Sequence, residues 1–192
     1  MEAEKRRIRQ RVRAERLSRS PAAREAAGEA LTAQLSDLVE STGARTLTCF
    51  VAIGGEPDTS GFLSWAAARH LLVLLPSARE DGGLDWFPDD GEPRASGAFG
   101  IPHPVGEPIT PRALEEVDLM LIPACAVDDA GTRLGWGRGY FDRALAAFPT
   151  PPPTFAVVYD EEVLPPLPAE PHDMPVDGIV TPTGWRRVQH RR

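Results

Sequence analysis

The feature that most constrains the fold is a series of short apolar runs separated by segments of helical character. Four runs are predicted to be buried strands: Thr46–Ile53, Leu71–Leu75, Leu119–Ile122 and Phe155–Tyr159. Each is continuously apolar and is bounded by Gly, Pro or polar residues. Strands that alternate with helices form parallel βαβ units. The sequence therefore predicts a three-layer α/β sandwich with a mainly parallel central sheet.

The helical segments have recognisable starts and stops. Glu4–Leu17 is typical of a basic helix, and Ser20-Pro21 supplies the N-cap and first-turn pair of a second helix that reaches about Ser41. We expect Pro76 to end the second apolar run. The remaining predicted elements are the helices Ser60–Arg69 and Tyr140–Phe148, a short helix begun by Thr110-Pro111, an edge strand Leu84–Phe87 within the Gly- and Pro-rich stretch Ser77–Pro108, and a last strand Ile179-Val180.

Composition limits the classes of function. A length of 192 residues suits one domain covering residues 1–192, and a net charge of -7 argues against a general nucleic-acid binder. No stretch reaches the roughly 18 apolar residues of a membrane span, and the charged N-terminus lacks a signal sequence. Cys49 and Cys125 have no metal-site spacing and are predicted to be buried. We expect a cytoplasmic protein with small-molecule substrates and no nucleic-acid, membrane or obligate protein partner.

Gly131–Arg143 is the segment richest in chemistry, with four glycines, three arginines and one aspartate in thirteen residues. Glycines let a ligand approach the main-chain amides closely, and arginines add positive charge, which together suit a polyanion and its metal. The pattern is neither a Walker A loop nor a dinucleotide fingerprint. In parallel sheets ligands bind at the carboxyl ends of strands, where we expect Gly54–Thr59, Pro76 and the loop after Ile122 to meet.

Lysine is nearly absent from the chain. Of 21 basic side chains, 20 are arginine and only Lys5 is lysine. An ammonium group is a compact charge that suits a phosphate oxygen, and Arg9 lies one helical turn later on the same face. Two interpretations remain open: Lys5 and Arg9 clamp phosphates, or Lys5 is an exposed residue of a frayed helix that survives by chance.

The whole of Pro123–Arg143 fits the pattern P-x-x-A-x-D-x-x-G-x-R-L-G-x-G-x-G-Y-[YF]-D-R. This pattern resembles the signature of the 5-formyltetrahydrofolate cyclo-ligase, or methenyltetrahydrofolate synthetase, family. Motifs similar to others of that family follow in the expected order over nearly the whole chain: Lys5-x-x-Ile8-Arg9, Glu56–Thr59, Phe99–Ile101 and His172–Asp177. His103, where the family commonly has glutamate, and Glu162, near a position that is often glutamine, depart from the pattern in predicted substrate-side loops.

The resemblance implies a reaction. Members of this family convert 5-formyltetrahydrofolate to 5,10-methenyltetrahydrofolate while hydrolysing ATP to ADP and phosphate, with Mg²⁺. Transfer of the γ-phosphoryl group to the formyl oxygen would make that oxygen a leaving group, and N10 would then close the ring. Phosphoryl transfer relies on positioning and charge stabilisation, so no side-chain nucleophile is needed.

The resemblance also implies a role for particular residues. It places ATP on Lys5, Arg9 and the glycine-rich loop residues Arg133, Leu134, Gly135, Trp136, Gly137, Arg138, Gly139, Tyr140 and Phe141. It places the folate on Ile53, Glu56, Asp58 and the loop residues Trp136, Gly137, Arg138, Gly139 and Tyr140. Mg²⁺ would be held by Asp142 and Asp173. For Asp58 and Asp142 the alternative is that each carboxylate caps the helix that follows it.

Two other functions remain alternatives at this point. A sugar-phosphate isomerase-like or CoA-transferase-like enzyme can share this architecture, but it does not need a lysine on an N-terminal helix. A non-catalytic folate- or nucleotide-binding protein would keep the cavity and lack turnover. An assay with 5-formyltetrahydrofolate, ATP and Mg²⁺ separates these possibilities.

Overall fold

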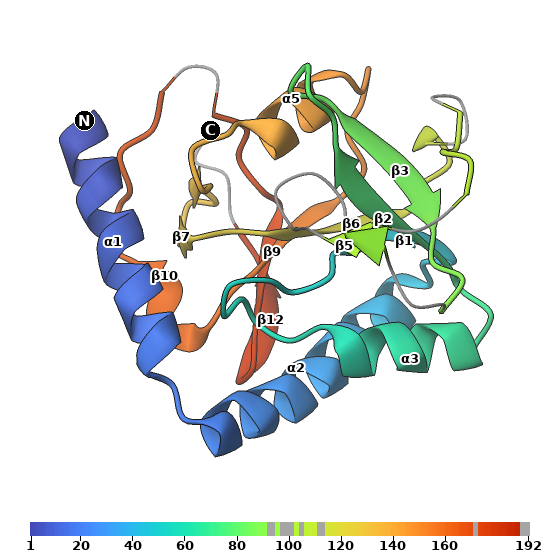
Figure 1. The fold of residues 1–192 in the computed structure, drawn as a ribbon, viewed down its shortest axis with the longest axis horizontal. Helices are drawn as coiled ribbons and strands as arrows, with labels where there is room; N and C mark the ends of the chain where they lie inside the picture. Colours follow the sequence, from blue (N-terminus) through green and yellow to red (C-terminus); the bar gives the residue numbers. More distant parts are fainter. Residues whose placement is uncertain (92–94, 97–101, 104–105, 111–113, 171–172, 189–192) are drawn as a thin grey trace.

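A seven-stranded sheet lies at the centre of the molecule in the computed structural model (Figure 1). The structure describes residues 1–91, 95–96, 102–103, 106–110, 114–170 and 173–188. The expectations for Phe99–Ile101, Pro111, His172 and the His103 side chain lie outside this description. The strands of the central sheet, in spatial order, are β12 (Gly184–Arg187), β11 (Gly178–Thr181), β9 (Thr154–Val157), β6 (Leu119–Pro123), β1 (Thr46–Thr48), β2 (Leu72–Ala78) and β3 (Leu84–Pro88).

The five strands from β11 to β2 are parallel to their neighbours, and the edge strands β12 and β3 are antiparallel. The predicted α/β fold with a mainly parallel sheet is therefore confirmed. The predicted edge strand is present as β3. The hairpin partner β12 was not predicted, because Trp185–Arg187 carries too many charged groups to resemble a buried strand.

Helices cover both faces of this sheet and form the three expected layers. α2 (Pro21–Thr42) and α3 (Ser60–Ala68) pack on one face, and α5 (Tyr140–Ala146) packs on the other. Alternation along β6 shows the two-sided burial: Leu119 and Leu121 join the α2–α3 core, whereas Met120 and Ile122 join the core beneath α5. The continuous apolar runs of the sequence follow from this arrangement.

The predicted second helix begins and ends for identifiable reasons. Ser20 is its N-cap, with an Oγ that accepts a hydrogen bond from the Ala23 amide at 3.2 Å, and Pro21 occupies the first turn. Gly43, with a φ of 69°, ends the helix in the left-handed conformation. The sequence signals at Ser20-Pro21 are therefore confirmed.

The first helix, α1 (Glu2–Ser18), stands beside the central sheet rather than on it (Figure 1). It packs through Val12 on a small three-stranded sheet and its surroundings, including Cys125, Ala126 and Leu134. The strands of this sheet, in spatial order, are β10 (Val163–Leu164), β7 (Ala126–Asp128) and β8 (Arg133–Leu134). Two further short strands, β4 (Ala95–Ser96) and β5 (Pro102–His103), pair with each other, and η2 (Asp160–Glu162) is a 3₁₀ turn.

Two boundaries differ from the sequence prediction. The predicted strand Thr46–Ile53 is a strand only as far as Thr48. The Cys49 amide still donates to the Leu74 carbonyl at 3.0 Å, but from Phe50 on the chain bonds locally: the Thr59 hydroxyl donates to the Phe50 carbonyl at 2.6 Å. The expected stop at Pro76 is wrong, since β2 continues to Ala78. The main-chain groups of Pro76, like those of Leu74, are on the side of β2 next to β1. Because β1 ends before it reaches Pro76, the N–H that proline lacks would have no hydrogen-bond partner in β1.

None of the helices in the described part of the chain is both long and apolar enough to span a membrane.

Candidate active site

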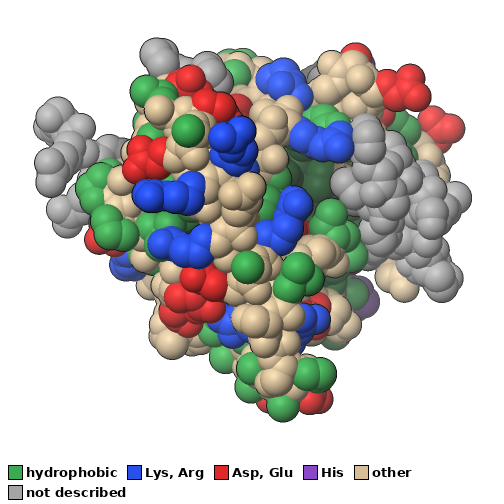
Figure 2. Space-filling view, turned by 60° about the vertical axis from the view of Figure 1, so that its left-hand side comes forward, with side chains coloured by type: hydrophobic (Ala, Val, Ile, Leu, Met, Phe, Trp, Pro, Cys, Tyr) green, Lys and Arg blue, Asp and Glu red, His purple; other side chains and the backbone are tan. Residues whose placement is uncertain are grey.

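A cavity of about 980 Å³ opens at the carboxyl ends of β1, β2 and β6. It is lined by α1, by Phe50–Glu56 after β1, by the end of β2, by the loop and helix Arg133–Arg143, and by Glu170 and Asp173. The three segments expected to meet at this edge of the sheet do meet. In Figure 2 Lys and Arg side chains gather around a hollow with hydrophobic side chains inside it. The cavity therefore combines a cationic rim with an apolar interior.

The glycine-rich loop is held by hydrogen bonds of the buried Asp128 at its start. The Asp128 carboxylate accepts from the amides of Ala130 and Thr132 at 3.0 and 2.9 Å, which forms the turn after β7. Gly131 has a φ of 84°, and its carbonyl accepts a hydrogen bond from the Val176 amide at 2.9 Å. A Cβ at Gly131 would lie 2.4 Å from the Val176 carbonyl oxygen, so only glycine fits. The loop is thus anchored before it enters the cavity.

The two cations of the N-terminal motif reach the cavity from one face of α1. Lys5 is only 4% exposed, and its Nζ donates to Asp173 at 2.7 Å and to Glu170 at 2.9 Å. Arg9 Nε donates to the Gly135 carbonyl at 2.9 Å, which joins α1 to the glycine-rich loop. The interpretation of Lys5 as an exposed residue of a frayed helix is wrong, because a buried ammonium needs partners and has two.

Charge keeps Lys5 protonated in this position. Burial, the largest influence, lowers the pKa of Lys5, but hydrogen bonds and charge from Asp173 and Glu170 outweigh it and leave the pKa above its usual value. The side chain therefore carries a full positive charge at the cavity wall. Such a charge is available to an anionic group that enters the cavity.

Arg133 and Asp142 form the second ion pair of the site. Arg133 is 5% exposed and donates to the Asp142 carboxylate, which also accepts from the Met174 amide at 3.3 Å. The Arg133 Nε is buried without a hydrogen-bond partner among the described residues. Asp142 does not cap the helix that follows the loop, since the N-cap of α5 is Gly139 and no side chain accepts a capping hydrogen bond there.

These contacts bear on whether the site suits a metal. Asp173 precedes Met174, whose amide reaches Asp142, so the two carboxylates belong to one short stretch of cavity wall. Within the described residues no three His, Cys, Asp or Glu side chains cluster as a preformed metal cage. Mg²⁺ commonly takes one or two carboxylates, waters and substrate phosphates, so two adjacent carboxylates fit its requirements when phosphate is present.

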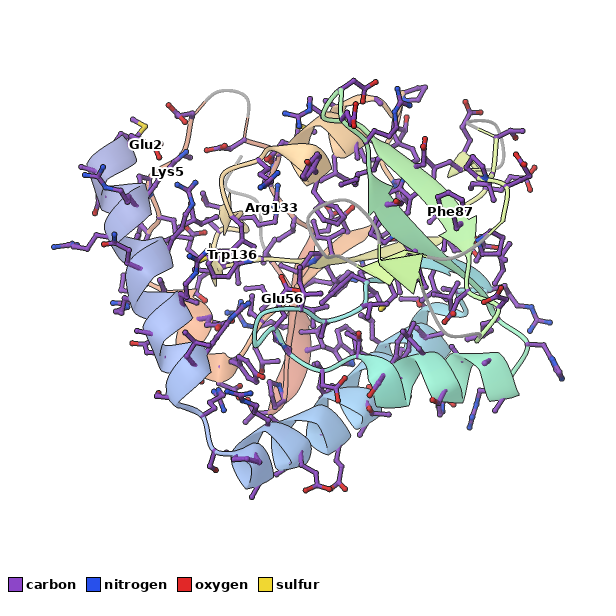
Figure 3. All side chains as sticks on the ribbon, in the orientation of Figure 1. Glu2, Lys5, Glu56, Phe87, Arg133 and Trp136 are labelled. Carbon is purple, nitrogen blue, oxygen red and sulfur yellow. The ribbon has the colours of Figure 1, made fainter. Side chains whose placement is uncertain are left out.

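The other side of the cavity has a different character. Ile53, Glu56 and Trp136 line it, and Figure 3 shows Trp136 and Glu56 in the space between α1 and the sheet, with Lys5 and Arg133 nearer one end. The Glu56 carboxylate accepts from the Ile53 amide at 3.1 Å. Burial raises the pKa of Glu56 against the opposing effects of that amide and of the Arg16 charge. A partly desolvated carboxylate beside an aromatic ring suits a flat ligand with N–H donors.

Asp58 is the one predicted site residue that does not line the cavity. Its carboxylate accepts from the Ser60 amide at 2.9 Å and from the Ser60 hydroxyl at 3.0 Å, at the start of α3. Its Cβ packs towards Gly28 of α2, because a Cβ at Gly28 would lie 3.3 Å from it. The structure therefore supports a local role for Asp58 at the start of α3, one residue before the N-cap Thr59, where its carboxylate holds the first helical residue. All other predicted site residues line the cavity.

Three important residues were not predicted. Glu170 holds Lys5, and Arg16 and Glu162 form a buried pair directly behind Trp136. Glu162, expected in a substrate-side loop, does not line the cavity. The signal for Arg16 was available: Lys5, Arg9 and Arg16 recur on one face of the helix, whereas Arg6, Arg7, Arg11 and Arg13 are exposed. Glu170 carried no comparable signal.

Comparison with known proteins gives consistent matches. The sequence model described as the 5-formyltetrahydrofolate cyclo-ligase family matches residues 1–182. The chain is 36% identical over 166 residues to a 5-formyltetrahydrofolate cyclo-ligase of Mycolicibacterium smegmatis, with 84% of each chain covered. It is 27% identical over 180 residues to that of Escherichia coli K12, covering 90% of this chain and 97% of the relative. The NMR structure of Aquifex aeolicus 5,10-methenyltetrahydrofolate synthetase has a TM-score of 0.82 at 30% identity, covering 98% of this chain and 94% of that one.

Proposed function

The chain belongs to the 5-formyltetrahydrofolate cyclo-ligase family, and from this membership we propose that the cavity at the carboxyl ends of β1, β2 and β6 holds both substrates of the family's reaction. That reaction is the ATP-dependent conversion of 5-formyltetrahydrofolate to 5,10-methenyltetrahydrofolate. Family membership decides against the isomerase-like alternative. The observation that carries the proposal is that the loop Arg133–Arg143 shares one cavity with Lys5 at one end and Glu56 at the other.

ATP occupies the end of the cavity formed by α1 and the loop. Lys5, Arg9 and Arg133 supply positive charge there, and Gly137 and Gly139, with φ values of 94° and 65°, expose main-chain amides. A Cβ at Gly137 would stand 3.5 Å from the Arg9 guanidinium, where it would crowd the space in which phosphate must meet that cation. Charge of this kind stabilises a phosphoryl group as it is transferred.

The folate occupies the end formed by Glu56, Ile53 and Trp136. The Glu56 carboxylate accepts hydrogen bonds from the amino and ring N–H groups of the pterin, and the apolar surroundings exclude water from the formyl group. Because the loop lines both ends of one cavity, the formyl oxygen and the γ-phosphate are held next to each other. Proximity of this kind is a large part of what catalysis of the transfer requires.

The chemistry needs no covalent intermediate with the protein. The formyl oxygen attacks the γ-phosphorus, the bond to the ADP oxygen breaks, and ADP leaves. N10 then attacks the activated formyl carbon to close the five-membered ring, its proton is lost, and the former formyl oxygen departs in phosphate. The protein orients both substrates and stabilises charge on the transferred group.

We further propose that Asp142 and Asp173 hold Mg²⁺ together with ATP. Mg²⁺ would neutralise charge on the phosphates. For these carboxylates to bind it, Lys5 and Arg133 must transfer their contacts from Asp173 and Asp142 to phosphate oxygens. Lys5 and Arg133 thus pair with the carboxylates before ATP binds and with phosphate once ATP is bound. A cytoplasmic location is also proposed, and the two buried cysteines, which form no disulfide, are in keeping with a reducing compartment.

The test is a direct assay of the purified protein with 5-formyltetrahydrofolate, ATP and Mg²⁺. We expect the absorbance of the methenyl product to grow only when ATP is present, with one ADP released per methenyl group formed. A non-hydrolysable ATP analogue should permit folate binding without product. Saturable binding of both substrates without product would instead establish the non-catalytic alternative, and absence of folate binding would overturn both.

A further inference from the structure

A buried ion pair lies behind the folate end of the cavity. Arg16 and Glu162 are each 1% exposed. Arg16 donates to Glu162 twice, from Nε at 2.6 Å and from Nη2 at 2.8 Å, and Nη2 also donates to the Ala124 carbonyl at 2.8 Å. Neither side chain lines the cavity. Any effect of the pair on substrates therefore passes through the residues that it touches.

Stability is a poor reason for such a pair to be present. Removing two charges from water carries a large desolvation penalty, and well-packed apolar side chains in place of a buried ion pair are often neutral or stabilising. Burial alone disfavours the charged form of Arg16, but the hydrogen bonds and charge of Glu162 outweigh it and raise the pKa of Arg16. What a fixed, bidentate pair provides better than apolar packing is orientation.

On one side the pair supports Trp136. The guanidinium carbon of Arg16 lies 5.1 Å from the centroid of the Trp136 ring, within the range of a cation–π contact. Trp136 is part of the glycine-rich loop and lines the cavity. The exposed Arg13 also approaches this ring, with its guanidinium carbon 5.6 Å from the centroid, but only Arg16 is fixed by three buried hydrogen bonds and so gives the ring a rigid surface.

On the other side the pair supports the segment that carries Glu56. Glu162 accepts from the Tyr159 amide at 2.9 Å, and the Tyr159 hydroxyl donates to the Glu56 carbonyl at 3.5 Å. Gly55, with a φ of 85°, lies against α1 so closely that a Cβ there would be 3.3 Å from the Arg16 Cβ. The main chain on both sides of the Glu56 carboxylate is thus located by Arg16 and Glu162.

We propose that the Arg16–Glu162 pair is a positioning device for the folate: it fixes Trp136 and Glu56 relative to each other. This proposal rests on the assignment of the folate to Glu56 and Trp136 in the proposed function. ATP binding depends on it less, because Lys5 and Arg9 have anchors of their own at Asp173, Glu170 and the Gly135 carbonyl. Loss of the pair should therefore affect the two substrates unequally.

The decisive variant replaces both partners by apolar residues of similar size, Arg16→Met with Glu162→Leu. This double variant removes the pair without leaving an unpaired buried charge, but the Tyr159 amide and the Ala124 carbonyl lose their side-chain partners, so it is expected to fold with a melting temperature several degrees below that of the wild type. We expect its KM and its dissociation constant for 5-formyltetrahydrofolate to rise by about 10- to 100-fold, the effect of a displacement of about 1 Å in a binding site. Its KM for ATP should change by less than about threefold.

Two single variants keep the proposal testable if the double variant fails to fold. Arg16→Lys retains the charge but cannot make the bidentate contact, and Glu162→Gln retains the shape but not the charge. Both should raise the KM for the folate more than the KM for ATP. The matched control is Arg11→Met, an exposed arginine on the same helix whose partner is Glu15, and it should leave both KM values unchanged.

A spectroscopic measurement gives a readout independent of turnover. Folate binding to the wild type should change the fluorescence of Trp136, identified by its loss in Trp136→Phe, and the paired variants should show that change only at higher folate concentration. A folded double variant with wild-type folate affinity would overturn the proposal while leaving the proposed function intact. Failure of the wild type to bind the folate would instead overturn the proposed function. Equal loss of ATP and folate affinity would reduce the pair to a general structural role.

Discussion

Lys5→Met tests whether the only lysine of the chain binds phosphate. Methionine keeps much of the length and apolar stem of lysine and removes the ammonium, whose Nζ lies at 2.7 Å from Asp173 and 2.9 Å from Glu170. When ATP binds, the proposed function requires this ammonium to contact a phosphate oxygen. A hydrogen bond involving a charged group contributes about 1.5–3 kcal/mol, so the variant should bind ATP about 10- to 150-fold more weakly.

The effect on the fold should be smaller. The Asp173 and Glu170 side chains are 16% and 38% exposed, so water can solvate both carboxylates once the ammonium is gone. We expect the free energy of unfolding to fall by about 1 kcal/mol, which in a chain of this size lowers the melting temperature by about 2–4 °C. The loss of ATP affinity therefore exceeds the loss of stability.

Thermal unfolding with and without nucleotide measures both quantities. ATP at 100 times the wild-type dissociation constant stabilises the wild type by about 2.7 kcal/mol, and a 50-fold weaker variant at the same concentration gains only about 0.6 kcal/mol. The ATP-induced shift should thus fall to about a quarter in Lys5→Met and persist in Arg7→Met, a control cation on the exposed side of the same helix. An unchanged ATP-induced shift in Lys5→Met would refute the phosphate contact and leave Lys5 only as an anchor of α1.

Four further predictions concern the site and its loop. Glu56→Gln should stabilise the protein at pH 7. Because the pKa of Glu56 is raised in the folded protein, the protonated side chain favours folding; this gain in the free energy of unfolding is complete below pH 4.5 and is lost as the pH rises through the folded pKa, whereas glutamine stays neutral. Calorimetry should show a higher stability for the variant, which should also bind the folate more weakly and lack the acid limb of the kcat/KM profile. Asp58→Ala should do the opposite, with unfolding easier by about 1 kcal/mol and folate KM unchanged, and a changed KM would return Asp58 to the site. Asp142→Asn should raise the Mg²⁺ concentration needed for half-maximal activity severalfold, while an unchanged metal titration would mean that Asp142 serves only Arg133. Gly131→Ala should lower the free energy of unfolding by about 1–3 kcal/mol from backbone strain alone, before the clash with the Val176 carbonyl is counted, and chemical denaturation that finds no loss would contradict this account of the loop.

Local signals explain what the sequence predicted about the fold. Strands buried on both faces are apolar throughout, so four of the central strands were visible as runs, and Ser20-Pro21 marks its helix start directly. The predictions failed where the secondary structure of a segment depends on the strand beside it. Pro76 stays within β2 because the neighbouring strand ends before it, and β7, β8 and β10 are too short to produce a period of their own.

The candidate site shows the same division. The residues placed in the site by motif line one cavity, with the exception of Asp58, whose short distance from the start of α3 gave the capping alternative in advance. Arg16 and Glu162 were not predicted because they are 146 residues apart in sequence. Nothing in a single sequence states that two such residues meet, or that a glutamate near a family glutamine position has a buried arginine as its partner.

One face of α1 links the two ends of the cavity. Lys5 and Arg9 face the proposed ATP end, and Arg16, two turns beyond Arg9, lies behind the folate end. A helix is stiff over this length, so the spacing between the phosphate-binding cations and the support of Trp136 is set by the helix backbone rather than by flexible side chains. The reaction needs the γ-phosphate and the formyl oxygen within bonding reach of each other. A single helix that locates both binding ends meets that need, and it explains why Lys5 and Arg16 are buried on one face of α1 while Arg6, Arg7 and Arg11 remain exposed.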